Sequence, residues 1–149
     1  AVNLTSVRPF ATTIKMIGNN FTSNDTAIFA TNGSQYFDIL NNTLSQNKFG
    51  LVSTNSSFSN STIMGNTFES HSEYAILASN GLTNSQFMEN LFDANKNACT
   101  LFNGCSGNNF KMNRFSQNTT SNLVFYNSAN QNKISENIFL SSSNTKAID

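Results

Sequence analysis

A six-residue motif recurs six times along this chain, at spacings of 23 or 24 residues. Its first and last positions are large and apolar, and its fourth position is always asparagine. A repeat of this length is a single supersecondary unit, which can bury its apolar face only against neighbouring copies. The sequence therefore predicts a solenoid. The six copies are MIGNNF, ILNNTL, IMGNTF, FMENLF, FKMNRF and ISENIF, and their asparagines are Asn19, Asn42, Asn66, Asn90, Asn113 and Asn137.

A second set of segments lies between these motifs. They are short apolar runs that close on asparagine, a pattern typical of a strand followed by a turn: AIFATN, GLVSTN, AILASN, CTLFN and LVFYN. No segment keeps a helical period of 3.6 residues. Leucine-rich repeats of similar length need several leucines and a helical half per repeat, and the chain lacks both. We therefore predict an all-β fold, a right-handed parallel β-helix of about six coils with 23–25 residues each.

Stacked coils place equivalent residues about 4.8 Å apart. A column of asparagines in that geometry can hydrogen-bond along the stack and satisfy the turn backbone. A column of phenylalanines can stack ring on ring in the core. These internal Asn and Phe ladders account for an unusual composition, in which Asn fills 27 positions, Ser 21 and Phe 14.

Charge and motifs limit the partners that the chain can have. Only 11% of the residues are charged and the formal net charge is zero, which argues against nucleic acid as a partner. No apolar run approaches the length of about 18 residues that membrane insertion requires. We expect no cofactor, because there is no glycine-rich phosphate loop and no metal-spaced set of Cys and His. Cys99 and Cys105 could be paired or free.

The segment STIMGNTFESHSEYAILASNG resembles the repeats of pectate-lyase-like parallel β-helix proteins. That superfamily includes NosD-like periplasmic proteins, viral tailspikes and bacterial surface proteins, and the resemblance extends from about Ile14 to Ile148. The pieces FTSN, FDAN and FSQN also look like repeats of chlamydial polymorphic membrane adhesins. The resemblance implies the fold. It leaves the function open among lyases, hydrolases, epimerases, adhesins and inert shafts.

The pattern predicts one β-helix domain over residues 1–149, with repeats over 14–148 and an irregular coil or cap remnant over 1–13. The final NTKAID looks like the first strand of a seventh coil. Uncapped ends suggest a fragment of a longer solenoid, or coils that stack end to end or pack in an oligomer.

Two neighbouring columns in the second set of segments are both apolar. Strand residues alternate faces, so either one column faces outward or the strand bends and buries both. An outward apolar stripe would suit a homotrimeric shaft or contact with a flanking domain. The two columns are Ile28, Leu51, Ile76, Cys99 and Leu123, and Phe29, Val52, Leu77, Thr100 and Val124.

Few residues are candidates for catalysis. Glu69 and Asp93 fall in one column of adjacent coils, and His71 interrupts a second asparagine column, with Glu73 two residues further on. These residues could form a paired-carboxylate site or a weak cation site, or simply a solvated acidic turn. Catalytic β-helices of this superfamily usually carry such clusters on an outer face.

The favoured hypothesis is a structural or adhesive β-helix segment of an extracellular protein, located on a cell surface or a virion. Polar faces rich in Asn, Ser and Thr would suit contact with polysaccharide or cell-surface glycan. The competing hypothesis is part of a polysaccharide lyase or glycoside hydrolase, with Glu69, His71 and Asp93 at its catalytic site.

Overall fold

The computed structural model describes residues 1–5, 13–55, 57–140 and 145–149. The described residues form nineteen β-strands and no helix. None of them belongs to a helix long and apolar enough to cross a membrane. The strands are short because each coil turns three times, and the longest has six residues.

Three parallel sheets run the length of the molecule. Sheet A contains β1 (Val2–Thr5), β4 (Thr26–Thr31), β7 (Phe49–Ser53), β10 (Tyr74–Ser79), β13 (Asn97–Phe102), β16 (Ser121–Tyr126) and β19 (Lys146–Ile148). Sheet B contains β2 (Ile14–Ile17), β5 (Phe37–Leu40), β8 (Thr62–Met64), β11 (Gln86–Met88), β14 (Asn109–Lys111) and β17 (Lys133–Ser135). Sheet C contains β3 (Asn20–Thr22), β6 (Thr43–Ser45), β9 (Thr67–Glu69), β12 (Leu91–Asp93), β15 (Arg114–Ser116) and β18 (Ile138–Leu140).

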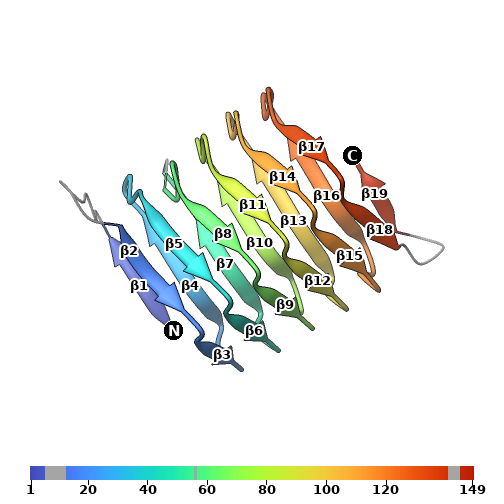
Figure 1. The fold of residues 1–149 in the computed structure, drawn as a ribbon, viewed down its shortest axis with the longest axis horizontal. Helices are drawn as coiled ribbons and strands as arrows, with labels where there is room; N and C mark the ends of the chain where they lie inside the picture. The colour runs from blue at the N-terminus through green and yellow to red at the C-terminus, as the bar shows by residue number, and fades with distance from the viewer. Residues whose placement is uncertain (6–12, 56, 141–144) are drawn as a thin grey trace.

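Every strand pairs in parallel with the strand one coil away, never with its neighbour in the sequence. Phe87, for example, pairs with Ile63 on one side and with Phe110 on the other. Figure 1 shows the coils side by side in chain order, from blue at one end to red at the other. The predicted solenoid of about six coils is confirmed.

The core is built from the columns that the repeat predicts. Phe68, Phe92, Phe115 and Phe139 stack with ring centroids 5.0, 4.8 and 4.8 Å apart. Of these four rings, the first three are fully buried. The sheet B column stacks in the same way, with Phe87 and Phe110 4.6 Å apart. The predicted Phe ladder is therefore present over four successive coils, and Leu44 takes its place in the coil before Phe68.

The predicted Asn ladder lies at the corner between sheets B and C. At each step a backbone N–H and a side-chain amide donate to the Oδ1 of the asparagine one coil later. In one step Asn113 donates to Asn137 with distances of 2.8 and 2.9 Å. The same side chains also bind the backbone of the sheet B strands, because Asn137 Nδ2 donates to the Phe110 carbonyl at 2.8 Å.

A third polar column, which the sequence analysis missed, lies at the corner before sheet B. The backbone N–H of Ser61 donates to Ser85 Oγ, and that of Ser85 donates to Asn108 Oδ1, at 3.1 and 3.0 Å. Asn108 then donates to Asn132 Oδ1. Serine and asparagine replace each other here because both present an oxygen to the next coil. The column could have been found two residues before the first apolar position in the last four motifs, whereas Ile14 and Phe37 hold that position in the first two.

The turns account for much of the remaining asparagine. Eight asparagines have positive φ, a conformation that Asn tolerates better than most residues: Asn32, Asn41, Asn55, Asn60, Asn80, Asn84, Asn103 and Asn127. At one of these turns glycine leaves room for the asparagine of the previous coil. Gly65 has φ of 65°, and a Cβ there would lie 2.4 Å from Asn41 Oδ1 of the previous coil.

Candidate functional site

The three predicted site residues do not lie together. Glu69 and Asp93 are register partners on sheet C, with Glu69 exposed and Asp93 half-buried. The Ser116 hydroxyl, one coil further, donates to Asp93 Oδ1. His71 lies inside the solenoid and is only 1% exposed. A catalytic role for Glu69 and Asp93 stays a prediction. The buried His71 imidazole does not lie beside the two carboxylates on the outer surface.

His71 occupies a place in the asparagine column at the corner between sheets C and A. Its backbone N–H donates to Asn95 Oδ1 at 3.0 Å, as an asparagine there would do. Its ring replaces the missing amide, since Nδ1 lies 3.3 Å from both the backbone nitrogen and the carbonyl oxygen of Asn47. Nε2 is buried without a hydrogen-bond partner. The imidazole therefore keeps the ladder continuous at the expense of one unsatisfied polar atom.

Room for this ring comes from the strand beside it. Ala27, Ala75 and Ala98 form a buried column at the start of the sheet A strands, and Gly50 is the member of that column in the coil before His71. A Cβ at Gly50 would lie 2.8 Å from His71 Nε2 and 2.5 Å from the Ala75 carbonyl oxygen. The larger His71 side chain is thus matched by the smallest residue available.

The column of alanines also changes residue type in the coil of Asn118. The sequence repeat predicts Ser142 at the next position of the asparagine column after Asn118, and Ser142 lies outside the described residues. In this coil Asn122 takes the place of the alanine, and Asn118 Nδ2 donates to Asn122 Oδ1 at 2.8 Å. Asn122 is fully buried. At His71 a departure from asparagine is therefore matched by a smaller residue in the neighbouring column, and at Asn118 the same column supplies a hydrogen-bond acceptor.

Burial makes His71 sensitive to acid. Burial lowers the pKa of His71 from 6.5 to about 4, although the backbone of Asn47 and Leu44 acts in the opposite direction. Between these pH values the unfolded chain binds more protons than the folded chain, so the free energy of unfolding falls as the pH drops from about 6.5 to about 4. The full difference corresponds to about 3 kcal/mol.

Urea unfolding of the wild type and of His71→Asn at pH 7 and pH 4.5 would measure this effect. Asparagine restores the ladder without a titratable group, so His71→Asn should lose much less stability on acidification. Parallel losses in the two proteins would contradict this origin of the pH dependence.

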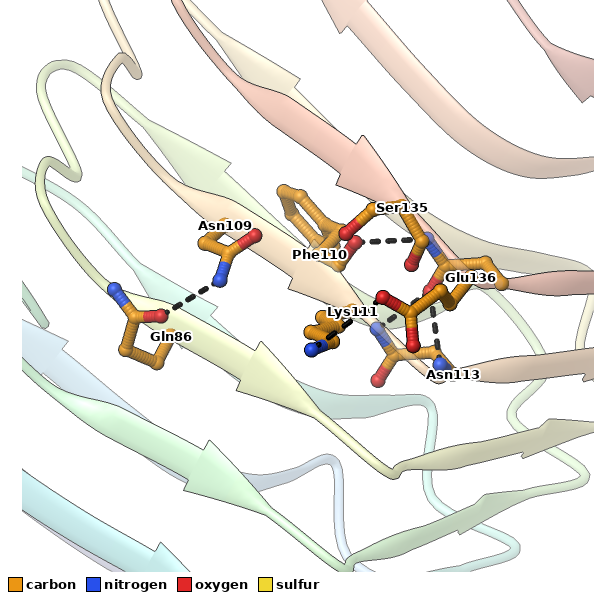
Figure 2. A network of polar contacts seen from close by, with 8 residues as sticks. Gln86, Asn109, Phe110, Lys111, Asn113, Ser135 and Glu136 are labelled. Carbon is orange, nitrogen blue, oxygen red and sulfur yellow. Dashed lines mark hydrogen bonds and ion pairs between the residues drawn. The ribbon is translucent and has the colours of Figure 1, made fainter.

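Charged side chains elsewhere form exposed pairs between coils. Lys111 Nζ lies 3.4 Å from Glu136 Oε1, beside the Gln86–Asn109 amide contact of 2.9 Å (Figure 2). Lys96 and Glu73 form a similar pair at 2.9 Å. Exposed pairs of this kind contribute about 1 kcal/mol or less. In each pair the lysine is already bound to a carboxylate of a neighbouring coil. Neither Lys96 nor Lys111 is therefore an unpaired cation.

The two cysteines are buried free thiols. Burial raises the pKa of both, and Cys105 Sγ donates to the Phe102 carbonyl at 3.0 Å. A thiol held in the protonated form is a poor nucleophile and a poor metal ligand. Both cysteines therefore act as small core residues.

The outward surface of sheet A contains apolar and aromatic side chains. Of the two apolar columns, the one through Ile28 is fully buried. The other faces outward, and its members Phe29, Val52 and Leu77 are half-buried outside the core. We call this surface the sheet A outer face. It has three columns: Thr26, Phe49, Tyr74, Asn97, Ser121 and Lys146; Phe29, Val52, Leu77, Thr100 and Val124; and Ser79, Phe102 and Tyr126.

Aromatic rings on this face stack between neighbouring coils. Phe49 and Tyr74 are nearly parallel, with centroids 6.2 Å apart. Phe102 and Tyr126 stack at 4.9 Å near the other end of the strands. Lys48 Nζ lies 5.3 Å from the centroid of Phe49. Stacking on a neighbour restricts each ring before any ligand arrives, which lowers the entropic cost of binding.

The sheet A outer face combines aromatic surface with polar side chains. Fixed aromatic rings offer apolar contact area with a polar hydroxyl at the edge of each tyrosine. Hydroxyl and amide side chains beside them supply hydrogen-bond donors and acceptors. Among the described residues, no three His, Cys, Asp or Glu side chains converge in a way that could hold a metal ion.

A family model described as "Periplasmic copper-binding protein (NosD)" matches residues 7–149. No curated protein and no solved structure shows significant similarity to the chain. The description implies copper, which favours thiolate, thioether and imidazole ligands. The cysteines and His71 do not fit it, because the thiols are buried and protonated and the His71 ring is enclosed against Gly50. The thioethers of Met64 and Met88, half-buried register partners on sheet B, are a soft-ligand pair without a thiolate or an imidazole from Cys99, Cys105 or His71. The match spans most of the chain and agrees with the observed coils, so this chain belongs to the NosD family of right-handed parallel β-helix proteins.

Proposed function

We propose that the chain is a structural or adhesive β-helix segment of the cell envelope or the extracellular space, and that it contacts glycans through the sheet A outer face. The observation that carries this proposal is the pair of aromatic stacks, Phe49–Tyr74 and Phe102–Tyr126, on one partly apolar surface. The periplasmic description of the family supports the location.

The physical argument rests on the chemistry of sugars. A pyranose ring presents a patch of C–H groups on its face and hydroxyls around its edge. An aromatic ring can cover the C–H patch, while Ser, Thr and Asn side chains bind the hydroxyls. Individual contacts of this type are weak. A rigid solenoid repeats them along an axis, so that a polymer with several sugar units gains affinity through multivalency.

We expect Tyr74→Ala and Phe102→Ala each to weaken polysaccharide binding about tenfold, because each change removes one ring of a stack. Affinity electrophoresis against dextran, soluble chitin oligomers and polygalacturonate, followed by calorimetry on the best ligand, would measure the change. Ile138→Ala is the matched control, since Ile138 is 51% exposed on sheet C, away from this face. Absence of binding by the wild type, or equal losses in the control, would overturn the proposal.

The alternative function is polysaccharide cleavage at Glu69 and Asp93. It is favoured only by their register pairing on the outside of sheet C. The binding samples also test it, because cleavage releases new reducing ends or unsaturated products. Product formation by the wild type that Glu69→Ala and Asp93→Ala abolish would replace the structural proposal with an enzymatic one.

A further inference from the structure

The sheet A outer face contains a hollow near its C-terminal end. Its volume is about 250 Å³. Thr100 and Val124 form its floor, and each is only 3% exposed although its side chain is on the outside of the sheet. Tyr74 and Tyr126 lie at its edges. A feature of this size is smaller than the usual pocket for a drug-sized ligand, which begins at about 300 Å³.

Changes in side-chain size along the columns create the hollow. In the first column the large Tyr74 is followed by the small Asn97 and Ser121. In the middle column Leu77 is followed by Thr100. In the third column the trend is reversed, since Ser79 is followed by Phe102 and Tyr126. The small residues Asn97, Ser121 and Thr100 are therefore neighbours in the register of the strands, and aromatic rings border them on two sides.

The polar groups around the hollow are ordered by their own contacts. Ser121 Oγ donates to Asn97 Oδ1 at 2.9 Å, and Asn97 Nδ2 donates to the Glu73 carbonyl at 3.1 Å. On the remaining side Lys146 Nζ and Asp149 Oδ2 form a pair at 2.6 Å. Because these two charges neutralise each other, the rim offers donors and acceptors without a net charge for an ionic ligand.

We infer that this hollow binds a single neutral sugar ring, one face of which contacts a tyrosine while its hydroxyls meet the polar rim. The inference rests on the proposed function and assigns one subsite within it. Two aromatic edges, a floor of one hydroxyl and one apolar side chain, and a charge-balanced rim match the C–H face and the hydroxyl edge of such a ring. An acidic sugar would find a lysine that is already paired.

Thr100→Phe should fill the hollow from its floor. Saturation-transfer NMR with methyl glycosides of neutral hexoses should show contact with the wild type and about tenfold weaker binding to Thr100→Phe. Ser121→Tyr fills the hollow from the side and should have the same effect. Thr67→Phe makes the same threonine substitution on sheet C, away from the sheet A outer face, and should bind like the wild type. Thermal unfolding of each variant confirms that it is folded.

The outcomes separate the subsite from the wider proposal. If Thr100→Phe and Ser121→Tyr bind both the polysaccharide and the methyl glycosides as the wild type does, the subsite is overturned. The proposal that the sheet A outer face contacts glycans is then unaffected. Stronger contact with galacturonate than with neutral glycosides would overturn its neutral specificity. If both variants lose glycoside binding and the wild type binds no polysaccharide, the subsite is supported and the adhesive role is overturned.

Discussion

Phe92→Ala is expected to destabilise the protein by about 4 kcal/mol. The Phe92 ring is fully buried and lies between Phe68 and Phe115, with centroids 5.0 and 4.8 Å away. Its removal loses the transfer free energy of the ring and leaves a cavity, and it also interrupts two aromatic contacts. The loss is a large fraction of the 5–15 kcal/mol that stabilises a typical domain.

Urea unfolding followed by far-UV circular dichroism would measure this loss. Phe49→Ala is the matched control, because Phe49 belongs to the sheet A outer face and is half-buried. We expect a change of about 1 kcal/mol or less for it. A similar cost at both positions would mean that the stacked core does not dominate the stability. A broadened transition in Phe92→Ala alone would indicate that the coils on its two sides unfold separately, as solenoids can do.

Asn90→Ala is expected to cost about 4 kcal/mol, although the side chain is polar and small. The Asn90 amide donates to the Ile63 carbonyl at 2.9 Å and to Asn113 Oδ1 at 3.0 Å. Its Oδ1 accepts from the Asn66 backbone N–H at 3.0 Å. Alanine removes the buried hydrogen bonds to the Ile63 carbonyl and from the Asn66 N–H, whereas Asn113 Oδ1 keeps the backbone N–H of residue 90. Water can replace the lost partners only by opening the corner.

Asn130→Ala provides the comparison, since Asn130 is an exposed asparagine outside the corner ladders. Its unfolding free energy should stay within about 0.5 kcal/mol of the wild type. If Asn90→Ala were equally mild, the ladder would be a consequence of stacking and not a cause of stability. Hydrogen exchange of the Asn66 amide would report the local effect, because this N–H donates to Asn90 in the intact ladder.

Sequence alone determined the coil length, the parallel pairing and the two kinds of ladder. The reason is that a ladder repeats one environment in every coil. Each buried position is therefore sampled several times within one chain, and chance cannot imitate a column such as Asn42, Asn66 and Asn90. The column through Ser61 and Ser85 was missed because two residue types satisfy the same requirement for an oxygen.

Only the tertiary structure decided which of two adjacent apolar columns faces the core. Alternation predicts opposite faces for neighbours within an extended strand. At the start of the sheet A strands, however, Ala27 and Ile28 are consecutive and both buried, so the corner shifts the phase of the alternation. Because of this shift, Phe29 and the residues in its column face outward. These residues form the middle of the sheet A outer face, which contains the hollow. His71 shows the same dependence, since its burial rests on the space left by Gly50 one coil away. A contact of that kind becomes visible only when the coils are stacked.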